Sequence, residues 1–270
     1  MRVAIAILLS LPTTPCLAAN LTLDGPVEQG ALVHGKTEPG AAVMLDGRPV
    51  RVAPDGGFII GFGRDAPAHA ALDLTLPDGS REHRELAIVP RHYEVQRIDG
   101  LPERQVTPDP AQLERIKREA ALINKARAAD SDMPYFERPL RWPVLGPISG
   151  VYGSQRILNG EPRQPHSGVD IAAPAGSPVA AAGGGTVMLA EPDLFFTGKT
   201  VIIDHGYGLS TIYQHLSRID VTVGQHVEAG DVIGAVGATG RVTGPHLHWG
   251  LSWYDTRLDP ALAAGAMPVP

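Results

Sequence analysis

The chain has 270 residues, which is enough for two domains with separate hydrophobic cores. Its formal net charge of −6 argues against nucleic acid or an anionic membrane surface as the main partner, so we expect no nucleic-acid partner. The few aromatic residues (5%) and the many glycines and prolines (31 and 25) favour turn-rich structure and predict a mainly β protein.

Residues 1–19 have the pattern of a secretory signal peptide. A positive charge at Arg2 precedes a short apolar run, and small residues end the stretch at Ala18 and Ala19. The run is too short for a permanent span, so we expect no integral membrane span in the mature chain. The single cysteine, Cys16, lies inside this stretch, which predicts a disulfide-free protein secreted across the inner membrane into the periplasm. A buried N-terminal strand and a lipid-anchored cysteine are the alternatives.

Residues 20–90 predict a small β-sandwich of the immunoglobulin-like kind. Short apolar runs resembling strands alternate with Asp-Gly turns such as Asp46-Gly47 and Asp78-Gly79. The runs lie at residues 33–35, 42–45, 58–60 and 72–76. Strands at this spacing are typical of a sandwich, and no catalytic grouping accompanies them. We expect this domain to position or restrain its neighbour.

Residues 91–135 are expected to be a linker that contains a helix. Asp109 is a suitable N-cap and Pro110 suits the first helical position. Apolar residues then recur at helical spacing, at Leu113, Ile116, Ala120 and Ile123, and the helix is expected to end at Met133-Pro134. The narrow stripe predicts a helix that rests one edge on a domain. A partner-binding helix, or a segment folded over the active site as an inhibitor, are the alternatives.

Residues 136–262 predict a Gly-rich antiparallel β-sheet domain, followed by a tail at 263–270. Short apolar runs fill this segment and no long helix is predicted in it. The glycines are expected at the bends of a tightly coiled sheet. His205 lies in a Gly-rich turn and His226 on a hairpin, so both are expected to be exposed.

Two short motifs in this domain place metal-binding side chains at even spacings. Because residues i, i+2 and i+4 of a strand point to one face, His166 can share a face with Asp170. By the same spacing, His246 can share a face with His248. Two such strands facing one cleft supply three or four nitrogen and oxygen ligands, which suits a zinc ion. Spacing leaves open whether His246 or His248 touches the metal, and each motif alone also suits a turn or an exposed strand.

A zinc hydrolase also needs a base that is not a ligand, because a proton must leave the water at the open metal position. The chain contains no His-Glu-x-x-His motif that would supply a glutamate. A histidine therefore has to fill the role. His215, which follows an apolar strand, is the candidate, and a surface histidine at a strand end is the alternative.

These residues resemble the three motifs of the lysostaphin-type (LytM) zinc metallo-endopeptidases. The matching motifs are His166-x-x-x-Asp170, Tyr213-x-His215-Leu216 and Gly244-Pro245-His246-Leu247-His248. The resemblance covers roughly residues 142–260 and leaves the N-terminal half uncovered. It implies an enzyme that hydrolyses amide bonds in peptidoglycan, in a cross-bridge or a stem peptide.

The resemblance also implies roles for individual residues. His166, Asp170 and His248 would hold one Zn²⁺ per chain, and His215 and His246 would act as base and oxyanion donor. Arg156 matches an arginine near the groove and would meet a substrate carboxylate, with a structural ion pair as the alternative. We further expect the loop at residues 194–196 to form a lip of the groove.

Two other functions compete with this interpretation. A non-catalytic relative that activates another cell-wall hydrolase typically lacks some of these residues, whereas all five are present here. A lipoyl- or biotinyl-type carrier would need a modifiable lysine at a hairpin tip, and Lys199 instead precedes a predicted strand.

Overall fold

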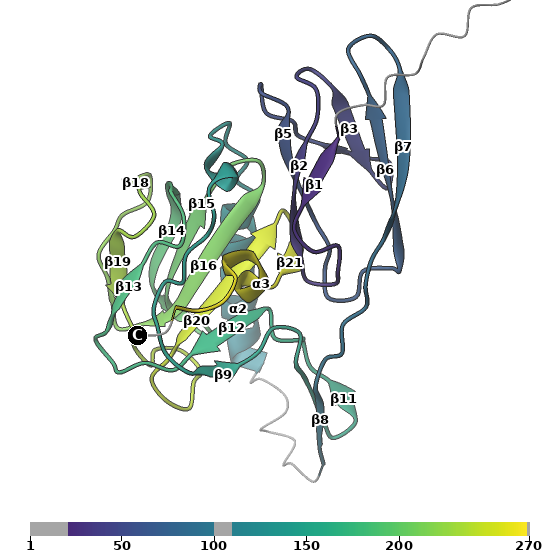
Figure 1. Cartoon of the computed structure of the whole chain (residues 1–270). Coiled ribbons are helices and arrows are strands. Elements are labelled where there is room, and N and C mark those ends of the chain that lie inside the picture. Colours follow the sequence, from purple (N-terminus) through teal and green to yellow (C-terminus); the bar gives the residue numbers. More distant parts are fainter. Residues whose placement is uncertain (1–20, 100–109, 269–270) are drawn as a thin grey trace, which may run out of the picture.

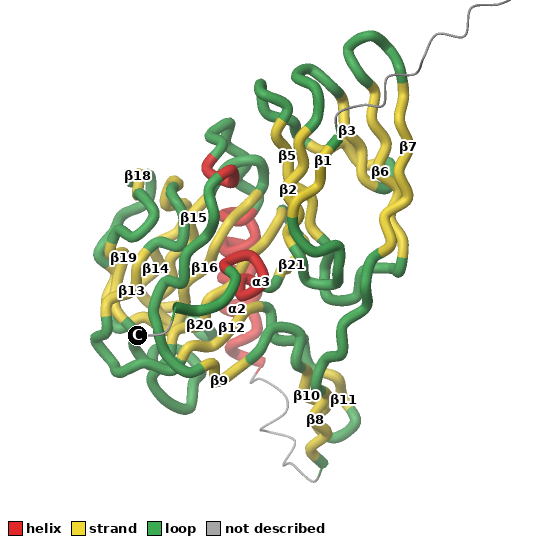
Figure 2. Tube along the Cα trace, in the orientation of Figure 1, coloured by secondary structure: helices red, strands yellow, loops and turns green. Residues whose placement is uncertain are grey.

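The computed structural model describes residues 21–99 and 110–268. Residues 1–19, where we expect the signal peptide, and the expected N-cap Asp109 lie outside these ranges. Two β-rich parts lie beside each other, and a long helix runs along one of them (Figures 1 and 2). Among the described residues, no helix has both the length and the apolar character needed to cross a membrane. The division of the chain at residues 90, 135 and 262 stays a prediction.

The N-terminal part is a sandwich of two antiparallel sheets, which confirms the predicted small β-sandwich. One sheet contains β1 (Thr22–Asp24), β2 (Leu32–Lys36) and β5 (Gly57–Gly61). The other contains β4 (Arg48–Val50), β3 (Ala42–Leu45), β6 (His69–Thr75) and β7 (Arg81–Ala87). Alternate residues of β6 point into the core between the sheets, as the period of a strand requires. The sequence did not predict β7, because this edge strand is charged rather than apolar.

The C-terminal part is built on an eight-stranded sheet in the order β18-β14-β15-β16-β20-β12-β9, with β21 paired to β20. All of its strand pairs are antiparallel, as predicted. The strands are β9 (Ile148–Gly150), β12 (Gly168–Ile171), β14 (Gly185–Leu194), β15 (Gly198–Asp204), β16 (Leu209–Leu216), β18 (His226–Val227), β20 (Leu247–Trp253) and β21 (Thr256–Leu258).

A second, three-stranded sheet covers one face of this large sheet. It contains β13 (Pro178–Ala180), β19 (Val232–Ala235) and β17 (Arg218–Ile219). Val179 and Ile233 from the small sheet share a core with Tyr213 and Trp249 from the large one. Burial on both faces explains why β16 is buried along its whole length.

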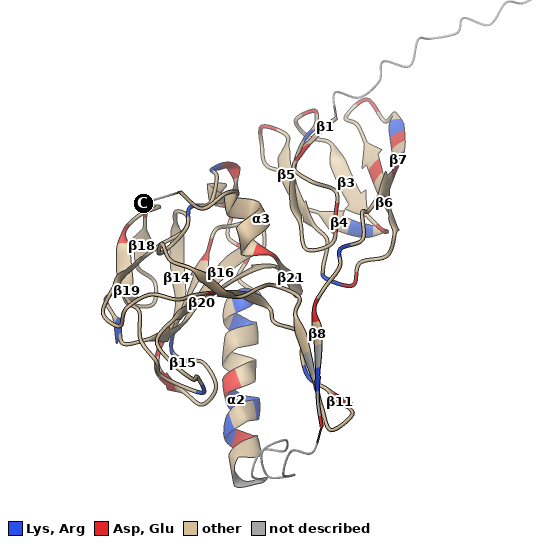
Figure 3. Cartoon of the chain, turned by 60° about the horizontal axis from the view of Figure 1, so that its bottom comes forward, with Lys and Arg blue, Asp and Glu red and all other residues tan. Residues whose placement is uncertain are grey.

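The helix α2 (Pro110–Arg127) packs on the opposite face, against β14 and β15. Ile123 and Ala126 contact a cluster formed by Leu189, Ile202 and Ile212. The start at the predicted proline is confirmed, but the helix ends six residues before Met133. The predicted stripe was partly wrong, since Leu113 and Ala120 are exposed. Charged residues cover the outer faces of the helix (Figure 3).

The remainder of the expected linker also contains a strand that the sequence did not predict. β8 (Val95–Ile98) pairs in parallel with β10 (Gln155–Leu158), which in turn pairs with β11 (Glu161–Pro162). The 3₁₀ helix η1 (Tyr135–Glu137) follows α2, and the short helix α3 (Pro260–Ala264) extends into the expected tail. That this segment inhibits the enzyme stays a prediction.

Arginines hold the sandwich against the C-terminal part. Arg64 Nε donates to the carbonyl oxygen of Gly153 at 2.6 Å. Arg91 Nη1 lies 2.9 Å from Asp259 Oδ2, an ion pair between residues 168 positions apart. These contacts fix the N-terminal part next to the loop after β9 and the start of α3.

Candidate metal centre and catalytic histidines

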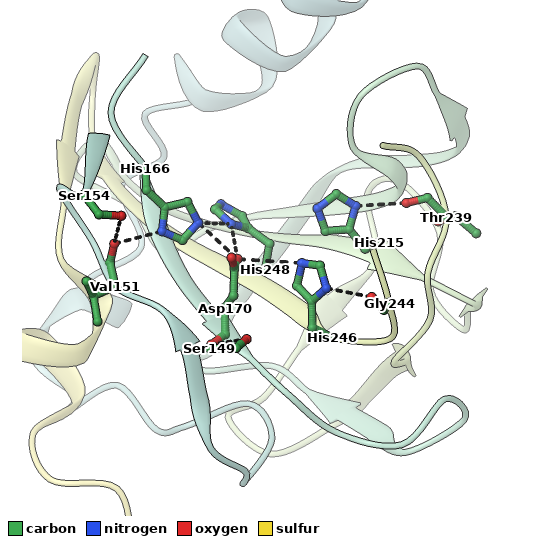
Figure 4. Close-up of polar contacts among 10 residues, drawn as sticks. All are labelled: Ser149, Val151, Ser154, His166, Asp170, His215, Thr239, Gly244, His246 and His248. Carbon is green, nitrogen blue, oxygen red and sulfur yellow. Dashed lines mark hydrogen bonds and ion pairs between the residues drawn. The ribbon is translucent and has the colours of Figure 1, made fainter. Parts of the chain in front are cut away.

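Three of the predicted metal ligands converge on one point of the large sheet. Asp170 of β12 lies opposite His248 of β20 in the strand register, so both side chains point to the same face. His166 lies in the loop before β12 rather than in the strand, and the expectation that its strand spacing aligns it with Asp170 is therefore wrong. The loop nevertheless turns the ring toward both partners (Figure 4).

The three ligand atoms form a nearly equilateral triangle. His166 Nε2 lies 3.0 Å from Asp170 Oδ1 and 3.0 Å from His248 Nδ1. The third side, from His248 Nδ1 to Asp170 Oδ1, measures 2.9 Å. His166 Nδ1 donates to the carbonyl oxygen of Val151 at 3.0 Å, which leaves a lone pair on Nε2. Two nitrogens and an anionic oxygen facing one another this closely suit a shared cation, so the donor set fits zinc.

A glycine makes room for the central carboxylate. Gly150 of β9 lies opposite Asp170 in the strand register. A β-carbon at this position would lie 2.4 Å from Asp170 Oδ2, well inside van der Waals contact. Gly150 is therefore a site residue that the sequence analysis missed, because its role depends on the pairing of β9 with β12.

His215 reaches the site through an unusual backbone conformation. It lies near the end of β16, one residue after Gln214, which is paired with His248. Strict alternation would point the side chain of residue 215 to the other face. Its φ of +65° breaks the alternation and turns the ring toward the site. The centre of the His215 ring lies 4.9 Å from the centre of the His246 ring and 6.2 Å from that of the His248 ring. Such strain in a residue other than glycine is concentrated at functional sites.

Backbone carbonyl groups orient both histidines outside the triangle. His215 Nδ1 donates to the carbonyl oxygen of Thr239 at 2.9 Å, and His246 Nδ1 donates to that of Gly244 at 2.9 Å. In each ring the Nε2 atom is therefore the one that is free to act on a substrate. His246 Nε2 lies 3.8 Å from Asp170 Oδ1, so its ring borders the triangle. His246 is the residue immediately before β20.

Burial and hydrogen bonding set the charges at this site. Burial by itself would raise the pKa of Asp170, but the adjacent His166 and His248 rings hold that pKa well below its usual range. Burial lowers the pKa of His248, and it lowers the pKa of His215 to about 4. At neutral pH the site therefore combines the Asp170 carboxylate with neutral rings at His248 and His215, the forms needed for a metal ligand and for a base.

The predicted groove lip is tied to the surrounding structure. Phe195 and Phe196 form the turn between β14 and β15, and their rings pack edge to face. The Arg241 guanidinium lies 4.3 Å from the centre of the Phe196 ring, which links the turn to the loop before His246. Glu119 of α2 accepts a hydrogen bond from Phe195 N at 2.7 Å.

Other predicted residues gave mixed results. The backbone of Arg156 belongs to β10, but its side chain lies outside the described residues, so its role stays a prediction. His226 is exposed as expected. The expectation for His205 was wrong, because this ring is 1% exposed, with Nδ1 2.6 Å from the carbonyl oxygen of Gly184.

Comparisons with known proteins agree with this geometry. A model of peptidase family M23 matches residues 164–260. The chain is 48% identical over 87 residues to the peptidoglycan DD-endopeptidase ShyA of Vibrio cholerae, covering 32% of this chain and 20% of that protein. It is 33% identical over 156 residues to the cell division protein DipM of Caulobacter vibrioides, covering 58% of this chain and 24% of that protein. The chain therefore spans a quarter or less of the length of these relatives.

One solved structure extends the similarity over nearly the whole chain. A Pseudomonas aeruginosa structure described as a peptidase M23 is 33% identical, with a TM-score of 0.67. The match covers 90% of this chain and 97% of that one, so it includes the N-terminal sandwich. The three motifs predicted a member of the lysostaphin-type endopeptidases, and these similarities confirm that prediction. The chain belongs to peptidase family M23.

Proposed function

We propose that the protein is a zinc-dependent endopeptidase that hydrolyses amide bonds of peptidoglycan outside the cytoplasm. The observation that carries the proposal is the convergence of five side chains, three in a triangle with sides of 2.9 to 3.0 Å and two histidines beside it. The names of relatives such as the DD-endopeptidase ShyA support peptidoglycan as the substrate. The cleaved bond lies in a cross-bridge or in a stem peptide.

In this proposal His166, Asp170 and His248 hold one zinc ion. The bound ion would acidify a water molecule and polarise the scissile carbonyl group. His215 accepts the proton at Nε2, because its Nδ1 hydrogen is engaged by Thr239 and its buried ring is neutral at pH 7. His246, whose Nε2 lies 3.8 Å from Asp170 Oδ1, is placed to donate a hydrogen bond from that nitrogen to the developing oxyanion.

Release of soluble muropeptides from purified sacculi tests the proposal. Full-length protein loaded with zinc should release them, whereas His215→Ala should not, although it keeps its metal. His226→Ala is the matched control, since this histidine is exposed and remote in the sheet order from β12 and β20. Equal release by the wild type and the His215 variant would reject the enzymatic mechanism.

The second candidate is the non-catalytic activator of another wall hydrolase that the sequence analysis raised; one relative, DipM, is named as a cell division protein rather than as a hydrolase. A regulator needs the surface of the fold rather than its catalytic histidines. It should therefore increase the activity of a partner hydrolase equally well as the wild type and as His215→Ala. Loss of all activity in that variant would favour the enzyme.

A further inference from the structure

A cavity of about 810 Å³ lies between the sandwich and the C-terminal part. Its lining includes His166 and Ser167 from the loop before β12, and Trp253 and Arg257 from the end of β20 and from β21. Arg127, the last residue of α2, completes this side. The volume is in the range of small-molecule and peptide sites. Since His166 is part of the lining, the cavity reaches one corner of the triangle.

Two guanidinium groups in this cavity lack the acidic partners that the other interface arginines have. Arg127 Nε is buried and has no hydrogen-bond partner among the described residues. Burial, reinforced by the charge of Arg257, lowers the pKa of Arg127 to about 9, so the group is still a cation at neutral pH. Arg257 is half-buried, and its Nη1 donates to Ser252 Oγ at 3.1 Å and to the carbonyl oxygen of Asp255 at 3.5 Å. Burial lowers the pKa of Arg257, and the charge of Asp255 opposes this effect.

Two partly buried groups of like charge repel each other unless an anion joins them. The acidic residues that share the cavity are already engaged. Asp65 pairs with Arg64 at 2.5 Å, and Asp46 accepts a hydrogen bond from Ala71 N at 2.8 Å. The two guanidinium groups are therefore available for a planar anion, and their donor geometry matches a carboxylate.

The register of β20 places the arginine pair along the same face as the metal triangle. His248, Gly250 and Ser252 alternate along the strand and share one face. Arg257 of β21 is paired with Ser252, four residues beyond His248. At about 3.3 Å per residue the pair lies about 13 Å along the strand from the triangle. An extended peptide of about four residues spans this distance.

We propose that Arg127 and Arg257 form a subsite that binds a free carboxylate of the peptide substrate, about four residues from the scissile bond. The proposal rests on the proposed function only in taking the substrate to be a peptide. In this arrangement the cavity between the sandwich and the C-terminal part selects peptides that carry a free carboxylate. A peptide that carries an amide in place of the carboxylate is accordingly a poor ligand.

Calorimetric titration of full-length protein with a matched pair of peptides tests the subsite. The peptides are an acetylated tetrapeptide ending in D-alanyl-D-alanine, as the free acid and as the C-terminal amide. They are titrated into the His215→Ala variant so that neither is cleaved. We expect the acid to bind about ten-fold more tightly than the amide, as charge-assisted pairing implies. Arg127→Gln or Arg257→Gln should bring this ratio to about one.

Controls separate the subsite from a structural role. Arg218→Gln removes an exposed arginine from β17 of the three-stranded sheet and should keep the ratio. Arg257→Lys retains the positive charge and should keep most of the acid-to-amide ratio. Arg127→Gln should unfold at the same temperature as the wild type or at a higher one, because it relieves a buried repulsion. An acid-to-amide ratio that is near one in the wild type, or that is unchanged in both glutamine variants, overturns the proposal. Failure to digest sacculi while the ratio persists would reject the hydrolase and leave the subsite intact.

Discussion

A methyl group on Gly150 should disturb the metal centre without removing a ligand. In Gly150→Ala the new carbon would lie 2.4 Å from Asp170 Oδ2, whereas ordinary contacts begin at 3.4 Å. The carboxylate must therefore move by about 1 Å, a displacement large enough to matter at a catalytic centre. Asp170 Oδ1 lies 3.0 Å from His166 Nε2 and 2.9 Å from His248 Nδ1, so such a movement separates it from at least one of them.

The expected change in zinc affinity follows from the support that surrounding residues give to metal ligands. Loss of such support typically weakens metal binding about 10- to 100-fold, and we expect the Kd for zinc to rise by that factor. Competition with a zinc chelator measures the Kd, and urea unfolding of the metal-free proteins checks that the fold is retained. Since Gly150 does not need a positive φ, alanine adds no backbone strain.

Gly244→Ala is the matched control for this prediction. A β-carbon on Gly244 meets nothing within 4 Å, and the carbonyl group that orients His246 is retained. Its zinc affinity should equal that of the wild type. An unchanged Kd in Gly150→Ala, or an equal loss in Gly244→Ala, would refute the reasoning that the cross-strand glycine makes room for the ligand.

Three further predictions concern catalysis, substrate binding and stability. His215→Asn should lower kcat about 10²- to 10⁴-fold with unchanged zinc content, and a small effect would remove His215 as the base. Replacing Phe195 and Phe196 by serine should weaken binding to sacculi several-fold, because the two half-buried rings lose their aromatic contact surface, and unchanged binding would reject the groove lip. Burial lowers the pKa of His205 below its ordinary value of 6.5, so the unfolded chain takes up a proton that the folded chain resists. The unfolding free energy should therefore fall below about pH 6.5 by at most about 1.4 kcal/mol per pH unit, and the same slope in His205→Gln would contradict this.

The sequence predicts which residues come together better than how each of them reaches the site. Histidine and aspartate at short spacings indicate a metal site, and the resemblance selects His166, Asp170 and His248 from the candidates. The spacing argument for His166 failed, because that residue precedes β12 and reaches Asp170 through a loop. Likewise, alternation would point His215 away from the site, and only its positive φ brings it there.

Features that depend on contacts between distant segments could not be predicted. Gly150 and the carbonyl group of Val151 support the triangle because β9 pairs with β12. β8 was not recognised as a strand because it pairs with a segment about 60 residues later in the chain, a relation that local patterns do not carry. His205 lies in a turn-like sequence, yet neighbouring segments bury it.

Elemental analysis of the purified full-length protein tests the central claim most directly. The account predicts one zinc ion per chain in the wild type and in His215→Ala, and a loss of zinc in His166→Ala. A wild-type protein that binds no zinc, or a His166 variant that retains the full amount, would contradict it.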